Sequence, residues 1–74
     1  MERKPYLELC QKYATNKKSG LVLYDGSRYY ARAYMLHFDE TGNALHTAVL
    51  MDTKANAEIY CKLERVEEFE KINF

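Results

Sequence analysis

Four side chains in this sequence are of types that ligate metal ions or act as nucleophiles: Cys10, His37, His46 and Cys61. A zinc site requires its ligands to converge on one point, and its cysteines commonly come in closely spaced pairs. Here the four residues are isolated from one another, and we expect His37 and His46 on opposite faces of one hairpin. We therefore predict no metal site and no bound cofactor.

A cysteine beside a histidine can also form a nucleophile and its general base, as Cys10 and His37 would if the fold joined them. No acidic residue is placed to orient the histidine, and no glycine-rich loop leads from a strand into a helix to hold a phosphate. We therefore predict no catalytic residues and a protein that is not an enzyme.

The sequence also contains an acidic run near its end, which comprises Glu64, Glu67, Glu68 and Glu70. Such a run is typical of a solvated helix face. The alternatives are that it mimics nucleic acid or binds cations.

The clearest functional signal is an alternation of arginine and tyrosine that continues into leucine and phenylalanine. Because side chains alternate between the two faces of a strand, we expect these residues to share one face. Tyrosine and arginine are enriched among the residues that dominate binding energy at protein interfaces, and small monomers rarely expose so apolar a surface. The predicted binding face consists of Tyr24, Arg28, Tyr30, Arg32, Tyr34, Leu36 and Phe38.

Three interpretations of this face are open. The sheet could curl into a barrel, or the tail could fold over the face, so that these residues are partly buried. The face could bind protein, either a second copy, with a dimer favoured, or another partner. It could instead bind single-stranded RNA or DNA, with bases stacked on Tyr30 and Tyr34 and phosphates on Arg28 and Arg32. Nucleic-acid binding would weaken steeply with added salt, whereas an aromatic protein interface would barely respond.

Length and composition indicate one small folded domain over residues 1–74. The chain has 74 residues, of which 47% are hydrophobic, and this fraction excludes a disordered chain. Its 11 basic and 11 acidic side chains cancel, which argues against a general polyanion binder. The charges are nevertheless uneven, because residues 1–37 carry seven basic and three acidic side chains, and residues 38–74 carry four and eight.

Periodicity and turn signals predict the elements that hold these residues. Apolar residues at helical spacing, with a proline near the start and a glycine beyond the end, predict a helix over residues 5–18. Apolar alternation and turn sequences predict an antiparallel meander over residues 21–63, with strands at 21–24, 28–38, 44–51 and 57–63. The tail, residues 64–74, suits either a short helix or a brief fifth strand. The predicted fold class is α+β: a helix packed on a meander of four or five strands, forming an open sheet or a small barrel.

The register of the first hairpin decides which side chains enter the core. A two-residue turn at Asp25-Gly26 would pair Val22 with Tyr29, and a bulged turn would pair Leu21 with Tyr29. We favour the bulged turn, because it places more apolar residues on one face. The core face is then Leu21, Leu23, Tyr29, Ala31, Ala33, Met35, Leu45, Val49, Met51, Ile59, Cys61 and Leu63.

The second hairpin contains Gly42, which we expect to take a left-handed conformation in a three-residue loop. This loop would pair Asp39 with Asn43. The pairs that follow along the strands are Met35 with Thr47, Ala33 with Val49 and Ala31 with Met51.

The helix and strongly bent meander together resemble the Sm-like small barrel. The resemblance rests on the helix 5–18, the strand 21–24 with its Asp25-Gly26 turn, the strand 28–38 and the segment 59–66, and it implies ring oligomers that bind RNA. The sequence departs from that pattern, because no glycine interrupts residues 28–38 and none follows Arg65. We transfer no functional residues from the family. The whole chain is also similar to short uncharacterised proteins of bacterial mobile elements and phages, which implies an accessory or inhibitory protein acting by contact.

The sequence carries no signal for a membrane or for secretion. Its apolar runs are shorter than the ~18 residues of a membrane span, and its charged N-terminus is not followed by the apolar stretch of a signal peptide. Two cysteines are too few for a secreted disulfide scaffold. We therefore predict a cytoplasmic protein with reduced cysteines and no membrane partner.

Overall fold

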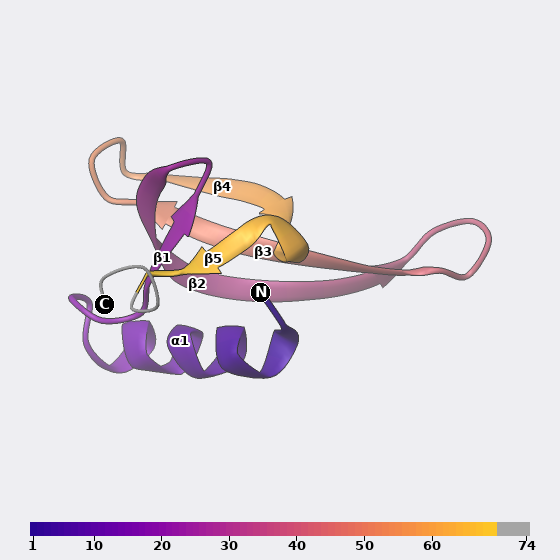
Figure 1. Cartoon of the computed structure of the whole chain (residues 1–74), viewed down its shortest axis with the longest axis horizontal. Helices are drawn as coiled ribbons and strands as arrows, with labels where there is room; N and C mark the ends of the chain where they lie inside the picture. Colours follow the sequence, from indigo (N-terminus) through magenta and orange to yellow (C-terminus); the bar gives the residue numbers. More distant parts are fainter. Residues whose placement is uncertain (70–74) are drawn as a thin grey trace.

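The computed structural model of the protein describes residues 1–69. An N-terminal helix packs on a five-stranded antiparallel open sheet, so the α+β prediction is confirmed (Figure 1). The strand order is β4-β3-β2-β1-β5. The elements are α1 (Arg3–Thr15), β1 (Leu21–Tyr24), β2 (Ser27–Phe38), β3 (Ala44–Asp52), β4 (Ala57–Lys62), the 3-10 turn η1 (Leu63–Arg65) and β5 (Val66–Glu68).

Helix α1 begins and ends earlier than the predicted range. Pro5 lies in its first turn, where a missing backbone N–H costs nothing. At the other end, Asn16 is extended, and its side-chain oxygen accepts the backbone N–H of Lys18 at 3.0 Å. Such local bonding by asparagine competes with helix continuation, which explains the early end. Within residues 1–69, no helix has the length and apolar character needed to cross a membrane.

The turn between β1 and β2 contradicts the favoured register. Val22 pairs with Tyr29, and Leu21 pairs with Tyr30, so the two-residue turn is the one formed. Asp25 and Gly26 have φ values of 52° and 79°. Positive φ at both central residues defines the type I′ turn, for which Asp-Gly is a preferred sequence. The bulged turn was wrong because the turn residues, rather than the burial of Leu21, determine the register.

The tip of the β2–β3 hairpin forms as predicted. Gly42 has a φ of 85°, and its N–H donates to the carbonyl oxygen of Asp39 at 3.1 Å. The backbone N–H of Asp39 donates in turn to the carbonyl oxygen of Asn43 at 3.0 Å. The three-residue loop and its pairing of Asp39 with Asn43 are therefore confirmed.

The Asp39 carboxylate gives this tip a pH dependence. It accepts hydrogen bonds from the Thr41 hydroxyl at 2.8 Å and from the backbone N–H groups of Thr41 and Asn43, both at 2.9 Å. These bonds, that of the Thr41 hydroxyl foremost, lower the pKa of Asp39 below its ordinary value. Their stabilisation is complete above the unfolded pKa of about 3.9 and is lost as pH falls through the lower folded pKa.

We therefore expect the amide resonances of Thr41 and Asn43 to titrate with a midpoint below about 3.9, the ordinary value for aspartate. Nuclear magnetic resonance spectra recorded between neutral and strongly acidic pH measure this midpoint. In the matched Asp39→Asn variant the same resonances should lose this transition. A midpoint at or above the ordinary aspartate value would show that the carboxylate does not hold the loop.

The base of the hairpin departs from prediction because β2 contains a β-bulge at Arg32. Before the bulge, Ala31 pairs with Leu50, and the predicted pairing with Met51 was wrong. An extra residue in one strand changes which side chains share a face on either side of it. Beyond the bulge the predicted pairs are found, Ala33 with Val49 and Met35 with Thr47.

The structure keeps some of the predicted core residues in the core and places others at the surface. Ala48 and Leu50 were not among the predicted core residues and are fully buried, whereas Met35 and Leu45 were predicted core residues and are 43% and 42% exposed. The turn register and the bulge account for the exchange, because each changes which residues face the interior. The predicted core residues that are buried are Ala31, Val49, Cys61 and Leu63.

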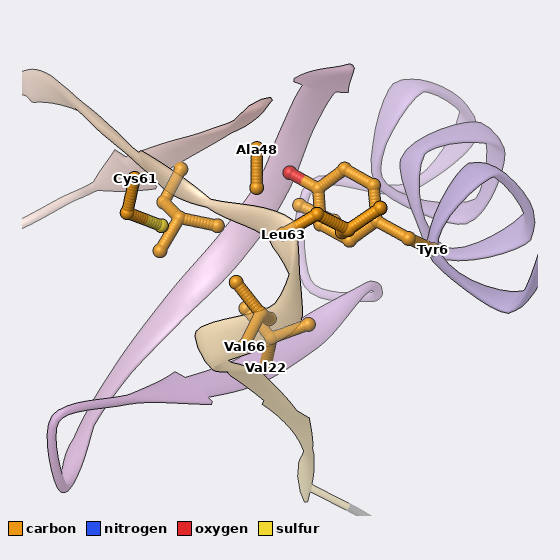
Figure 2. Packing of buried hydrophobic residues seen from close by; sticks show 8 residues of the cluster. Tyr6, Val22, Ala48, Cys61, Leu63 and Val66 are labelled. Atoms are coloured by element: carbon orange, nitrogen blue, oxygen red, sulfur yellow. The ribbon is translucent and has the colours of Figure 1, made fainter. Parts of the chain in front are cut away.

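The chain after β4 closes this core. Leu63 and Val66, from η1 and the start of β5, pack over Val22 and Ala48 (Figure 2). Strand β5 pairs antiparallel with β1, so the brief fifth strand is formed. The predicted tail extends to residue 74, and its last residues lie outside the part of the chain that the structure describes.

Tyr6 connects α1 to the sheet at the bulge. Its side chain is fully buried among the core residues (Figure 2). Its hydroxyl donates to the carbonyl oxygen of Val49 at 2.9 Å. Burial raises the pKa of Tyr6, the neighbouring Cys10 raises it further, and the backbone N–H of Ala33 opposes the shift. The phenol therefore stays protonated and keeps its donor role.

Candidate functional site

The seven residues of the predicted binding face do not share one face of the sheet. Opposite residues of paired strands point to the same side, so Tyr30, opposite Leu21, lies on the face away from Val22. Arg32 occupies the bulge, and the alternation resumes beyond it in the opposite phase. Arg28 and Tyr30 are therefore on one face, and Tyr24, Tyr34, Leu36 and Phe38 are on the other, which is the face of the core.

Several of the seven residues are engaged by neighbouring elements. Tyr30 stacks on Tyr13 of α1 with ring centroids 5.2 Å apart. Arg32 Nε lies 3.5 Å from an Oε atom of Glu58 on β4, an exposed ion pair that contributes about 0–1 kcal/mol. Two further contacts involve Arg28 and Tyr24: the Arg28 guanidinium lies 5.7 Å from the Phe69 ring centroid, and the Tyr24 and Tyr29 ring centroids are 6.3 Å apart.

Strands β2 and β3 continue beyond the rest of the sheet as a two-stranded extension (Figure 1). Strand β1 pairs with β2 only as far as Tyr30, and β4 pairs with β3 only from Thr47 onward. Among the described residues, the strand segments 35–38 and 44–47 therefore pair with each other, and of these only Thr47 also pairs with another strand, through Lys62 of β4. We call residues 35–46 the arm.

The arm exposes large apolar side chains on both of its faces. Leu36 and Phe38 are on the face shared with the core, and Met35 and Leu45 are on the other. Exposed apolar patches of a few hundred Å² commonly mark interaction sites in small proteins. The exposed fractions are 43% for Met35, 44% for Leu36, 66% for Phe38 and 42% for Leu45.

Two polar pairs bind the strands of the arm to one another at its base. The Tyr34 hydroxyl is hydrogen-bonded to Nδ1 of His46, and their rings stack with centroids 5.9 Å apart. On the other face, Nε2 of His37 lies 3.2 Å from the Thr47 hydroxyl. The two histidines therefore lie on opposite faces, as predicted. In residues 1–69 no group of three or more His, Cys, Asp or Glu side chains is arranged to hold a metal ion.

A cavity of about 630 Å³ opens beside the base of the arm. One wall is formed by His37 of β2 and the edge of β3 at residues 44–47, and the others are the start of α1 and the junction of β4 with η1. The Met1 amino group spans this junction, because it donates to the carbonyl oxygens of Leu63 at 3.1 Å and Val66 at 2.8 Å. Apolar and charged side chains both line the cavity, among them Met1, Leu45, Leu63, Arg3, Lys62, Glu2 and Glu64.

The two thiols are placed for packing. Cys61 is buried, Cys10 is partly buried against the core, and both are free. Burial raises the pKa of Cys61 and that of Cys10, although the nearby Arg32 partly offsets the shift at Cys10. A raised pKa leaves little of the reactive thiolate at neutral pH.

The cavity and the doubly apolar arm were not found by sequence reasoning. The signal for the arm is the segment 35–38, in which three of four successive residues are apolar, so that both faces of the strand are apolar. The signal was missed because Met35 was assigned to the core. The cavity joins residues 1–3 to residues 44–47 and 62–64, and no local pattern predicts that meeting.

Comparison of the chain with protein-family models, with curated proteins and with solved structures finds no match in any of the three.

Proposed function

We propose that this protein is a non-enzymatic binding module and that the arm is its contact surface for protein. The observation that carries the proposal is the exposure of Met35, Leu36, Phe38 and Leu45 on a hairpin segment that pairs with no other described strand. Covering apolar surface contributes about 25 cal/mol per Å² removed from water. A partner that covers both faces of the arm therefore gains more binding free energy than a partner that covers only one face.

Charge supports protein over nucleic acid as the partner. The arm carries Asp39 and Glu40 and has no lysine or arginine. Single-strand binding requires cations beside the stacking rings, but Arg28 is on the opposite face from Tyr34 and Arg32 is paired with Glu58. Single-stranded RNA or DNA is the alternative partner, and a gel shift that weakens steeply with salt would support it.

Two predictions from resemblance stand beside this proposal. The likeness to Sm-like barrels implies RNA-binding rings, and the likeness to mobile-element and phage proteins implies an accessory or inhibitory role by contact. The second role is compatible with the arm as a contact surface. The first would require a basic surface away from the arm.

A photo-crosslinking amino acid placed at position 38 tests the proposal. Position 60 is the matched control, because Phe38 and Tyr60 are both aromatic strand residues, 66% and 61% exposed. After irradiation of the producing cells, we expect protein adducts from position 38, identified by mass spectrometry, and few from position 60. Equal yields at the two positions, or none at position 38, would contradict the proposal.

A further inference from the structure

We propose that the partner of the arm is a second copy of this chain, bound by edge-to-edge pairing of the two β3 strands at residues 44–46. In this dimer, the turn at residues 39–43 of each copy lies at the cavity of the other. The inference rests on the proposed function and names the partner of the same surface.

The first support is an unpaired strand edge beside the cavity. Strand β4 covers β3 from Thr47 to Asp52, so in the described structure residues 44–46 have no neighbouring strand on that side. Residues 44–47 also line the cavity, which places the free edge in its wall. An uncovered edge presents backbone donors and acceptors to another strand, and β-strand addition is a common mode of recognition.

The second support is the geometry of a two-fold pair. If an antiparallel pair is centred on Leu45 of both copies, Ala44 of one copy lies opposite His46 of the other. The next residue, Thr47, is already paired on this edge with Lys62, the last residue of β4. The turn at residues 39–43 therefore meets the end of the other copy's β4, at the mouth of the cavity. Such an interface is reciprocal, as two-fold symmetry requires.

The third support is charge complementarity at this meeting point. The turn carries the exposed acidic residues Asp39 and Glu40, and it meets Lys62. Arg3 also lines the cavity. Two acidic residues line it as well: Glu2, which precedes α1, and Glu64, which follows the end of β4. Lys62 is the charge that the strand register brings to the turn. The chain has no net charge, so two copies do not repel each other as a whole.

The fourth support is the fit of an apolar side chain to the cavity. Phe38, immediately before the turn, is the most exposed large apolar residue of the arm, at 66%. A cavity of roughly 150 Å³ already admits a benzene ring, and this one measures about 630 Å³. Pairing would bring the Phe38 ring of each copy to the cavity of the other, where Leu63 of the core and Met1, which packs against the core, are available as apolar contacts.

Sedimentation equilibrium over a wide concentration range tests the dimer. We expect a reversible dimer whose dissociation constant rises by at least about tenfold in Phe38→Ser, as for loss of an interface anchor. Tyr60→Ser is the control, because this residue is an equally exposed aromatic that does not line the cavity. Its dissociation constant should change by less than about twofold.

A charge exchange tests the geometry independently of Phe38. Glu40→Lys and Lys62→Glu should each weaken the dimer, and the double variant should restore it, because the pair re-forms with its signs reversed. All of these side chains are exposed, so the fold should be retained, and circular dichroism verifies this. If the double variant weakens the dimer by the sum of the two single effects, the proposed pairing is overturned.

The outcomes separate this inference from the proposed function. A monomer at every concentration overturns the second copy as partner, and adducts from position 38 to other proteins would still support the arm as a contact surface. A dimer unaffected by Phe38→Ser and by the charge exchange overturns the edge-to-edge geometry. A dimer sensitive to both changes, with restoration in the double variant, supports it.

Discussion

Replacing Tyr6 by phenylalanine should lower the free energy of unfolding by about 1–3 kcal/mol, although the two side chains have nearly the same shape. The hydroxyl of Tyr6 donates to the carbonyl oxygen of Val49 beside the bulge, in a fully buried position. Without it, that carbonyl loses a partner that water cannot easily replace. Tyr6→Ala also leaves a void and should cost about 3–5 kcal/mol, as much as the core of so small a domain contributes. We therefore expect Tyr6→Ala not to fold.

Chemical denaturation of Tyr6→Phe beside Tyr60→Phe measures this effect. Tyr60 is 61% exposed, and its hydroxyl lies 3.5 Å from Glu58, so its loss should change stability by less than about 0.5 kcal/mol. Equal losses in the two variants would show that the Tyr6 hydroxyl does not hold α1 to the sheet.

The same hydroxyl adds a loss of stability at alkaline pH. Burial raises the folded pKa of Tyr6 above its unfolded value of about 10. Its contribution is therefore complete below that value and decreases as pH rises toward the folded pKa. Tyr6→Phe should lose less stability above about pH 10 than the wild type does.

Replacing Gly20 by alanine should destabilise the protein more than the same change at Gly42. Both glycines have positive φ, 83° and 85°, a conformation that costs other residues about 1–2 kcal/mol. At Gly20 an added Cβ would lie 2.5 Å from the carbonyl oxygen of Leu9 and 2.9 Å from Cβ of Tyr13, whereas at Gly42 nothing lies within 4 Å. The contact with α1 should add about 1–3 kcal/mol to the strain at Gly20.

Gly20 is also the point where the loop after α1 joins the sheet. Its carbonyl oxygen accepts the backbone N–H of Ala31 at 2.9 Å, next to the bulge. A backbone displaced by the added Cβ would weaken this bond. Denaturant unfolding of the two alanine variants measures the difference, and equal losses at the two glycines would mean that α1 moves away at little cost.

Local signals in the sequence predicted the elements of this fold well. The Asp25-Gly26 turn and the Gly42 loop divide the chain where the strands end, because each requires a left-handed backbone that few residues adopt. The helix and the four longer strands follow from apolar periodicity. The error lay in weighing the burial of Leu21 and Leu23 above the turn type, which shifted β1 by one residue.

The candidate site was predicted less well, because its geometry depends on the bulge at Arg32. No glycine or proline marks this position. Beside the bulge, the Tyr6 hydroxyl of α1 donates to the carbonyl oxygen of Val49, and these two residues are far apart in the sequence. Strict alternation placed Arg28 and Tyr34 on one face, and the bulge separates them. The apolar end of the predicted face, Leu36 and Phe38, is retained in the arm.

Hydroxyl-radical footprinting tests most directly whether the arm is the contact surface. In dilute protein, we expect oxidation of Leu36 and Phe38 on the arm and of two exposed reference residues, Tyr60 on β4 and Leu7 on α1. In concentrated protein, or in an extract of the producing cells, the arm residues should become protected and the reference residues should not. Unchanged oxidation of the arm under both conditions, or protection of Tyr60 or Leu7 in its place, would contradict the account.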